Sequence, residues 1–174
     1  IEAIAYANKE ARTASWMYGN MVDYAWFSGR HELALPHAQQ AVLSAESFGS
    51  PFFITVAARA QCLALWLNGR FEEAVSVMER VRPHTLPGRS AHQFEANHLA
   101  TLARAYRGVQ RWDDAHEAAT RAIASAQKSS SRVWEIAGWL ELLAMPKGSA
   151  AVARAAEGLA RCESLIASSG ARGF

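Results

Sequence analysis

The stretch Leu65-Trp66-Leu67-Asn68-Gly69-Arg70-Phe71-Glu72-Glu73-Ala74 has one counterpart earlier in the chain and one later. These counterparts are Ala25-Trp26-Phe27-Ser28-Gly29-Arg30-His31-Glu32-Leu33-Ala34 and Arg107-Gly108-Val109-Gln110-Arg111-Trp112-Asp113-Asp114-Ala115. Each stretch ends on an alanine, and the three alanines are 40 and 41 residues apart. A fixed period of this length is typical of stacked supersecondary units. We therefore expect an array of similar units, with the small alanine side chain placed where two elements cross closely.

Each of the three stretches predicts the end of one helix, a tight turn and the start of another helix. Gly29, Gly69 and Gln110 occupy the turn, and glycine is a strong turn signal. Acidic residues such as Glu72 and Asp113 follow the turn, in the first helical turn, where a carboxylate interacts favourably with the positive end of the helix dipole. The repeated unit is therefore predicted to be a helical hairpin.

The composition favours an all-α fold. Alanine occupies 36 of the 174 positions, whereas valine, isoleucine and threonine together occupy only 20. Alanine is the strongest helix former, and β-branched residues are those that favour strands. Eighteen lysines and arginines stand against 16 acidic residues, a net charge of +2, which is too even for a protein that binds nucleic acid by bulk charge.

Other features of the sequence suggest a cytoplasmic piece of a larger protein. No apolar run approaches the roughly 20 residues needed to span a membrane, so no membrane partner is expected. The first residue is Ile1, without a charged-then-apolar leader, which suggests a fragment of a longer chain. Cys62 and Cys162 form no disulfide framework, which suggests a reducing, cytoplasmic setting.

Turn signals between apolar-periodic segments divide the chain into eight expected helices. They span residues 11–28, 31–48, 52–68, 71–82, 90–108, 112–128, 132–144 and 149–168. Residues 1–8 are expected to be the tail of an earlier helix. Pro36 predicts either a kink or a helix start near Leu35, because proline fits without losing a hydrogen bond only in the first helical turn. The expected hairpins are about 11–48, 52–82, 90–128 and 132–168, in a single domain over 1–174.

The third hairpin carries a family resemblance. The pattern Leu99-x-x-Leu102-Ala103-x-x-Tyr106, followed by Trp112 and Ala115, resembles the tetratricopeptide repeat signature. The middle hairpin keeps this pattern loosely, with Cys62, Leu65, Gly69, Phe71 and Ala74, and the first has Tyr18, Met21 and Val22. The resemblance implies a right-handed α-solenoid of about four antiparallel helical hairpins. The period near 40 exceeds the usual 34 residues, which implies longer helices.

A narrower resemblance concerns the larger proteins in which similar repeat regions occur. The stretch Phe48-Gly49-Ser50-Pro51-Phe52-Phe53, the run Leu99-Ala100-Thr101-Leu102-Ala103-Arg104-Ala105-Tyr106 and the ending Ser168-Ser169-Gly170-Ala171-Arg172-Gly173-Phe174 carry it. They look like the C-terminal repeat region of large bacterial signalling proteins. In those proteins a class III adenylate or guanylate cyclase, or a DNA-binding domain, is joined to an ATPase module. The resemblance implies a non-catalytic interaction or regulatory module, with any cyclase or ATPase outside this chain.

The residues themselves suggest no enzyme and no cofactor. The sequence contains neither a glycine-rich phosphate loop nor a Gly-x-Ser-x-Gly elbow, and both cysteines are expected to be inert. Glu95-x-x-His98 and Asp113-x-x-His116 have the spacing of di-iron ligands. Antiparallel packing would offset the two histidines by roughly 9 Å along their helices. We therefore expect packing or surface histidines and no metal, which leaves a helical-bundle enzyme as a remote alternative.

The candidate binding residues come from the tetratricopeptide resemblance, in which the first helix of each hairpin lines a concave groove. Counting from the repeated alanine places eight residues there: Trp16, Asp23, Trp26, Arg59, Trp66, Asn97, Arg104 and Arg107. Aromatic residues and arginine are enriched at interaction hot spots. The expected partner is a protein or peptide, or another domain of the same chain, and not nucleic acid.

Two other interpretations of these residues remain open. The tryptophans could fill the space between long helices, with the arginines merely solvated. A small-molecule sensor of a transcription regulator would instead place its ligand in a dry pocket lined by the tryptophans. Exposed repeat ends would also favour self-association.

Overall fold

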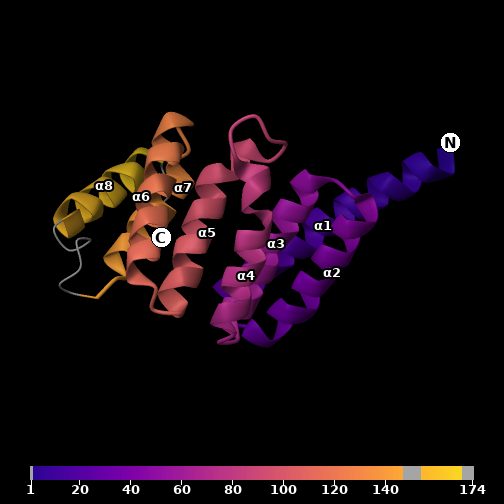
Figure 1. Ribbon diagram of the computed structural model, residues 1–174, viewed down its shortest axis with the longest axis horizontal. Helices are drawn as coiled ribbons and strands as arrows, with labels where there is room; N and C mark the ends of the chain where they lie inside the picture. The colour runs from indigo at the N-terminus through magenta and orange to yellow at the C-terminus, as the bar shows by residue number, and fades with distance from the viewer. Residues whose placement is uncertain (1, 147–153, 170–174) are drawn as a thin grey trace. The chain divides into compact units, whose positions relative to one another are not determined.

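The computed structural model describes residues 2–146 and 154–169, which form α-helices and short 3-10 helices without any strand (Figure 1). The α-helices are α1 (Glu2–Phe27), α2 (Ala34–Phe48), α3 (Pro51–Leu67), α4 (Phe71–Val81), α5 (Glu95–Gly108), α6 (Trp112–Lys128), α7 (Arg132–Leu143) and α8 (Ala155–Ser169). The 3-10 helices are η1 (His31–Leu33), η2 (Arg82–Thr85) and η3 (His92–Phe94). The all-α class predicted from composition is confirmed.

The chain divides into two compact units, Ile1–Gln93 and Phe94–Phe174, which we call unit 1 and unit 2. In unit 1, α1 packs against α2 and α3, and α3 packs in turn against α2 and α4. In unit 2, α5 packs against α6 and α7, and α7 also contacts α6 and α8. In each unit, two successive helix pairs are thus in contact through the first helix of each pair, α1 with α3 and α5 with α7. A single domain over 1–174 stays a prediction.

The repeated alanines are buried as the 40-residue period predicts. Ala34, Ala74 and Ala115 each have 0% of their surface exposed. The turns before them share one backbone conformation, with positive φ angles of 70° at Gly29, 73° at Gly69 and 60° at Gln110. Glycine adopts this left-handed conformation readily, and the third turn tolerates a glutamine in its place. The three stretches, two in unit 1 and one in unit 2, therefore share a buried alanine and the same turn conformation.

Helix boundaries differ from the predicted ones in two places. Helix α1 is continuous from Glu2, so the predicted break after residue 8 is wrong; Lys9, Glu10 and Ala11 are all good helix formers. Helix α5 begins at Glu95 rather than at residue 90. The backbone N–H of Ala91 donates instead to the carbonyl oxygen of His84, at 3.1 Å, which holds the preceding residues in a loop.

The two remaining boundary questions concern Pro36 and the last helix. Pro36 is the third residue of α2, so it lies in the first helical turn, where its missing N–H leaves no hydrogen bond unmade. This matches the predicted start near Leu35 rather than a kink. The expected start of the last helix at residue 149 lies outside the described residues, and α8 is described from Ala155.

Helix α7 approaches α6 closely at Gly138. A Cβ atom at this position would lie 2.7 Å from Cγ1 of Ile123 and 3.3 Å from the carbonyl oxygen of Ala119, closer than carbon atoms pack without displacement. The absent side chain therefore allows α7 to sit deep in unit 2, and it carries Glu135 and Glu141 into the interior. No helix of the described residues has both the length and the hydropathy needed to cross a bilayer.

Candidate functional site

The eight predicted groove residues lie on the first helix of each of three helix pairs. Trp16, Asp23 and Trp26 are on α1, Arg59 and Trp66 on α3, and Asn97, Arg104 and Arg107 on α5. The first five belong to unit 1 and the last three to unit 2. We describe the two sets separately.

In unit 1 the structure brings together Asp23 and Arg59. The guanidinium Nη1 and Nη2 atoms of Arg59 donate to the two carboxylate oxygens of Asp23, at 3.0 and 2.5 Å. The Asp23 side chain is 27% exposed and the Arg59 side chain 18%. A two-pronged pair of this kind is both stronger and more directional than a single charged hydrogen bond. It joins α1 directly to α3.

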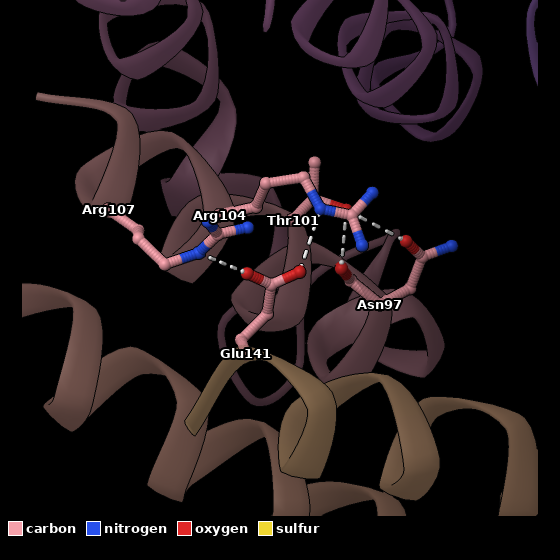
Figure 2. Close-up of polar contacts among 5 residues, drawn as sticks. All are labelled: Asn97, Thr101, Arg104, Arg107 and Glu141. Carbon is pink, nitrogen blue, oxygen red and sulfur yellow. Dashed lines mark hydrogen bonds and ion pairs between the residues drawn. The ribbon is translucent and has the colours of Figure 1, made fainter. Parts of the chain in front are cut away.

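In unit 2 two arginines of α5 share one carboxylate of α7 (Figure 2). The Nε atom of Arg104 donates to Oε1 of Glu141 at 2.7 Å, and Nε of Arg107 donates to Oε2 at 3.0 Å. The Glu141 side chain is only 3% exposed, whereas those of Arg104 and Arg107 are 17% and 23% exposed. A carboxylate buried this deeply needs such partners, because an unpaired buried charge is strongly destabilising.

Two further polar residues of α5 lie beside this ion-pair cluster (Figure 2). Asn97 and Thr101 are buried, with 4% and 8% of their surfaces exposed. The Thr101 hydroxyl donates to the backbone carbonyl of Asn97 at 2.9 Å. The predicted groove residue Asn97 is therefore part of a buried polar strip on α5, rather than a solvated surface residue.

The charged groove residues thus connect the first helices of successive helix pairs. The pairs Asp23–Arg59 and Arg104–Glu141 are 36 and 37 residues apart in sequence, close to one repeat. Glu141 was not predicted from the sequence to be a partner of these arginines, although the sequence contains a signal for it. Helix α7 is largely apolar and yet contains two glutamates, Glu135 and Glu141, and carboxylates in an apolar helix require cationic partners.

The three groove tryptophans differ in exposure. Trp16 is 44% exposed, and its ring centroid lies 6.4 Å from that of Phe53 in an edge-on arrangement. Trp26 is half-buried and packs against the core cluster formed by residues such as Val22, Leu63 and Ala64. Trp66 is half-buried as well, with its ring 6.2 Å from that of Phe71. Packing against neighbouring side chains therefore covers much of the surface of Trp26 and Trp66, whereas Trp16 presents a large apolar surface to solvent.

The second buried carboxylate of α7 is held by residues of two neighbouring helices. Arg161 of α8 donates from Nε to Oε1 of Glu135 at 2.7 Å and from Nη2 to Oε2 at 3.2 Å. Gln127 of α6 donates to Oε1 at 2.9 Å. The hydrogen bonds from Arg161, assisted by the bond from Gln127, hold the pKa of the Glu135 carboxyl below its usual value, despite the opposing effect of burial. Glu135 therefore links α6, α7 and α8.

Because of this lowered pKa, the contribution of Glu135 to the stability of the fold depends on pH in a defined direction. A carboxylate whose pKa is lower in the folded state stabilises the fold above its ordinary pKa of about 4.5, and this stabilisation is lost as the pH falls below that value. We expect the stability advantage of the wild type over Glu135→Gln to be constant near neutral pH and to shrink below about pH 4.5. Urea unfolding followed by helical circular dichroism at about pH 6 and about pH 3 measures it.

The Arg161→Gln variant should show the same flattened pH dependence, because Arg161 is the main cause of the lowered pKa. The other carboxyl groups are present in all three proteins, so the differences in stability between them report on the Glu135–Arg161 contact. If the free energies of unfolding of the wild type and Glu135→Gln changed with pH in parallel, the lowered pKa assigned to Glu135 would be contradicted.

Both cysteines and His98 lie in packed positions, whereas Asp113 is exposed and His116 is half-buried. Cys62 and Cys162 are buried free thiols, and burial, together with the charge of Glu135, raises the pKa of Cys162, which disfavours the reactive thiolate. Glu95 accepts a hydrogen bond from the Ser125 hydroxyl at 2.9 Å. His98 is 2% exposed. Within the described residues, no three histidine, cysteine or acidic side chains are grouped as metal ligands would be.

A cavity of about 370 Å³ opens in unit 1 among α2, α3 and α4. Its lining combines apolar side chains with a few polar ones: Leu35, Ala38, Gln39, Val42, Leu43, Gln61, Leu65, Arg70, Glu73 and Val77. None of the eight predicted groove residues lines it, and no tryptophan does. The tryptophan-lined pocket expected of a small-molecule sensor therefore does not coincide with this cavity.

Comparison of the sequence with protein-family models and with curated proteins finds no match.

Proposed function

We propose that this chain is a non-catalytic protein–protein interaction or regulatory module, built as a tetratricopeptide-like right-handed α-solenoid of about four hairpins. The 40- and 41-residue spacing of the buried alanines Ala34, Ala74 and Ala115 and the paired helices of each unit support this proposal. Its setting would be the cytoplasm, within a larger bacterial signalling protein. Its partner would be a protein, a peptide or another domain of the same chain.

The observation that carries the proposal is an exposed apolar face on α1. Trp16, Met17, Tyr24 and Phe27 are 44%, 48%, 60% and 72% exposed. At 3.6 residues per turn these four positions fall within an arc of about 100° on one side of the helix. The opposite side carries the fully buried Val22 and Ala25. We call the four exposed residues the α1 face.

The chemistry of the α1 face suits a protein partner. Tryptophan, tyrosine and phenylalanine combine a large apolar surface with few rotatable bonds, so little conformational entropy is lost on binding. Exposed apolar patches on soluble proteins mark interaction sites. The ion pair between Asp23 and Arg59 fixes α1 against α3, and so pre-organises this face. In the proposed function, the role of Arg59 is therefore to position α1.

The test is site-specific crosslinking followed by affinity measurement. The photoreactive residue p-benzoylphenylalanine is placed at Phe27 of the α1 face or, as a control, at Val133 on α7, which is 67% exposed. We expect a defined partner to crosslink from position 27 and not from position 133. For that purified partner, Trp16→Ala should weaken binding by roughly tenfold, a typical hot-spot effect.

Leu159→Ala is the matched control, because Leu159 is a 54% exposed apolar residue on α8. Equal binding by Trp16→Ala, Leu159→Ala and the wild type would contradict a role for the α1 face. A second copy of this chain as the crosslinked partner would identify the module as self-associating, and sedimentation of the Phe27→Ala variant as a monomer would establish it.

A further inference from the structure

Residues 80–93 form a second unusual surface of unit 1, which we call the cationic loop. It contains Arg80, Arg82, His84, Arg89 and His92, and no acidic residue. With both imidazoles neutral, its three arginines give it a charge of +3, whereas the whole chain carries only +2. Positive charge is therefore concentrated in this one segment.

The cationic loop is anchored at its base and exposed at its tip. The carbonyl oxygen of His84 accepts the N–H of Ala91 at 3.1 Å, and Thr85 donates from its hydroxyl to the carbonyl of Arg82 at 2.9 Å. Thr85 and Ala91 are buried. Between them Leu86 is 41% exposed and Arg89 is also exposed. Figure 1 shows this segment as the loop that follows the end of α4.

The arginines of the cationic loop differ from most others in the chain. Eight arginines elsewhere in the described residues are ion-paired: Arg59, Arg70, Arg104, Arg107, Arg111, Arg121, Arg154 and Arg161. Across the same described ranges, Arg80, Arg82 and Arg89 make no ion pair. Arg80 lies in the last turn of α4, where a cation interacts favourably with the helix dipole. Arg89 has no such structural reason for its position.

We propose that the cationic loop binds an acidic segment of a partner protein, with carboxylates on Arg82 and Arg89 and an apolar side chain on Leu86. Guanidinium groups match carboxylates geometrically and bind them in pairs of hydrogen bonds. The exposed leucine favours a peptide that combines acidic and apolar residues. Nucleic acid fits less well, because single-strand recognition uses exposed aromatic side chains for base stacking, and residues 80–93 contain no aromatic residue apart from the two histidines. This surface is separate from the α1 face.

The experiment uses a fluorescein-labelled peptide made of four Glu-Glu-Leu repeats and measures its fluorescence anisotropy with the whole chain at low salt. The Arg82→Gln/Arg89→Gln variant should bind this peptide about three- to tenfold more weakly than the wild type, as expected for the loss of two surface charge contacts. The control Arg12→Gln/Arg30→Gln removes the same charge from unit 1 at two other exposed arginines without ion pairs among the described residues. It should bind within twofold of the wild type.

Charge reversal provides an independent check that does not depend on weak binding alone. Arg82→Glu/Arg89→Glu should lose the glutamate peptide and bind the corresponding Lys-Lys-Leu peptide better than the wild type does. Thermal unfolding verifies that the variants remain folded, and Arg80→Gln/Arg89→Gln replaces any variant that does not. Equal weakening by the loop variant and the control variant would overturn the proposal. So would wild-type binding to a 20-nucleotide DNA or to phosphatidylserine vesicles that is tighter than to the peptide and is lost in the loop variant.

Discussion

Replacing Arg104 and Arg107 together with methionine is expected to lower the free energy of unfolding by about 3–5 kcal/mol, the cost of leaving a buried charge without its partners. Glu141, with 3% of its side chain exposed, would then lose both of its arginine partners. Methionine keeps most of the length of the arginine side chain, so the loss of packing is small. Urea unfolding followed by circular dichroism measures the change.

Adding Glu141→Met to this double variant distinguishes charge from packing. A fully apolar replacement of a buried ion cluster is often neutral or stabilising, so the triple variant should recover most of the lost stability. The same reasoning predicts that Glu141→Met alone costs less than the double variant, because the two arginines are partly exposed and can turn towards water. A triple variant as unstable as the double one would show that the ion pairs do not determine the effect.

Replacing Ala74 with leucine is expected to lower the free energy of unfolding by roughly 1–3 kcal/mol through overpacking. Ala74 has none of its surface exposed, and it lies where α4 packs against α3. Three added carbon atoms cannot be accommodated there unless the helices move apart. Chemical denaturation of the variant and the wild type gives the difference.

Ser76→Leu is the matched control, because Ser76 is an exposed residue of the same helix. It receives the same leucine side chain on the exposed side of α4, and the helix propensities of alanine, serine and leucine differ by less than about 1 kcal/mol, but no neighbouring helix is displaced. We expect its stability to remain within about 0.5 kcal/mol of the wild type. Equal stability of Ala74→Leu and Ser76→Leu would contradict the close crossing of the helices at the repeated alanine.

In the proposed function, the ion pairs help to order the helices on which a binding surface such as the α1 face is built. The Asp23–Arg59 pair connects α1 to α3, and the Glu141 cluster connects α5 to α7. In each unit the first helices are therefore fixed to one another by charged contacts as well as by apolar packing. A binding surface built on such helices loses little entropy when a partner binds, because it is already ordered.

The sequence by itself determined the helices, their turns and the small residues at their crossings. These features are local: glycine or glutamine in a left-handed turn, acidic residues in the next helical turn, and an alanine recurring after 40 or 41 residues. Helix propensity and periodicity act over a few residues, so one sequence is enough to read them. Two boundaries were exceptions: α1 continues through the break predicted after residue 8, and at the start of α5 the hydrogen bond between Ala91 and His84 decided between loop and helix.

Only the tertiary structure decided which charged and aromatic residues face solvent. Arg59, Arg104 and Arg107 were expected to lie in a groove, but their carboxylate partners Asp23 and Glu141 are supplied by helices 34 to 37 residues away in sequence. Whether two such side chains meet depends on how each helix is rotated about its axis and on how closely the helices approach. Both are set by packing at positions such as Gly138, whose missing side chain lets α7 carry its glutamates into the interior. Packing over such distances is a collective property of the folded chain, and no short stretch of sequence contains it.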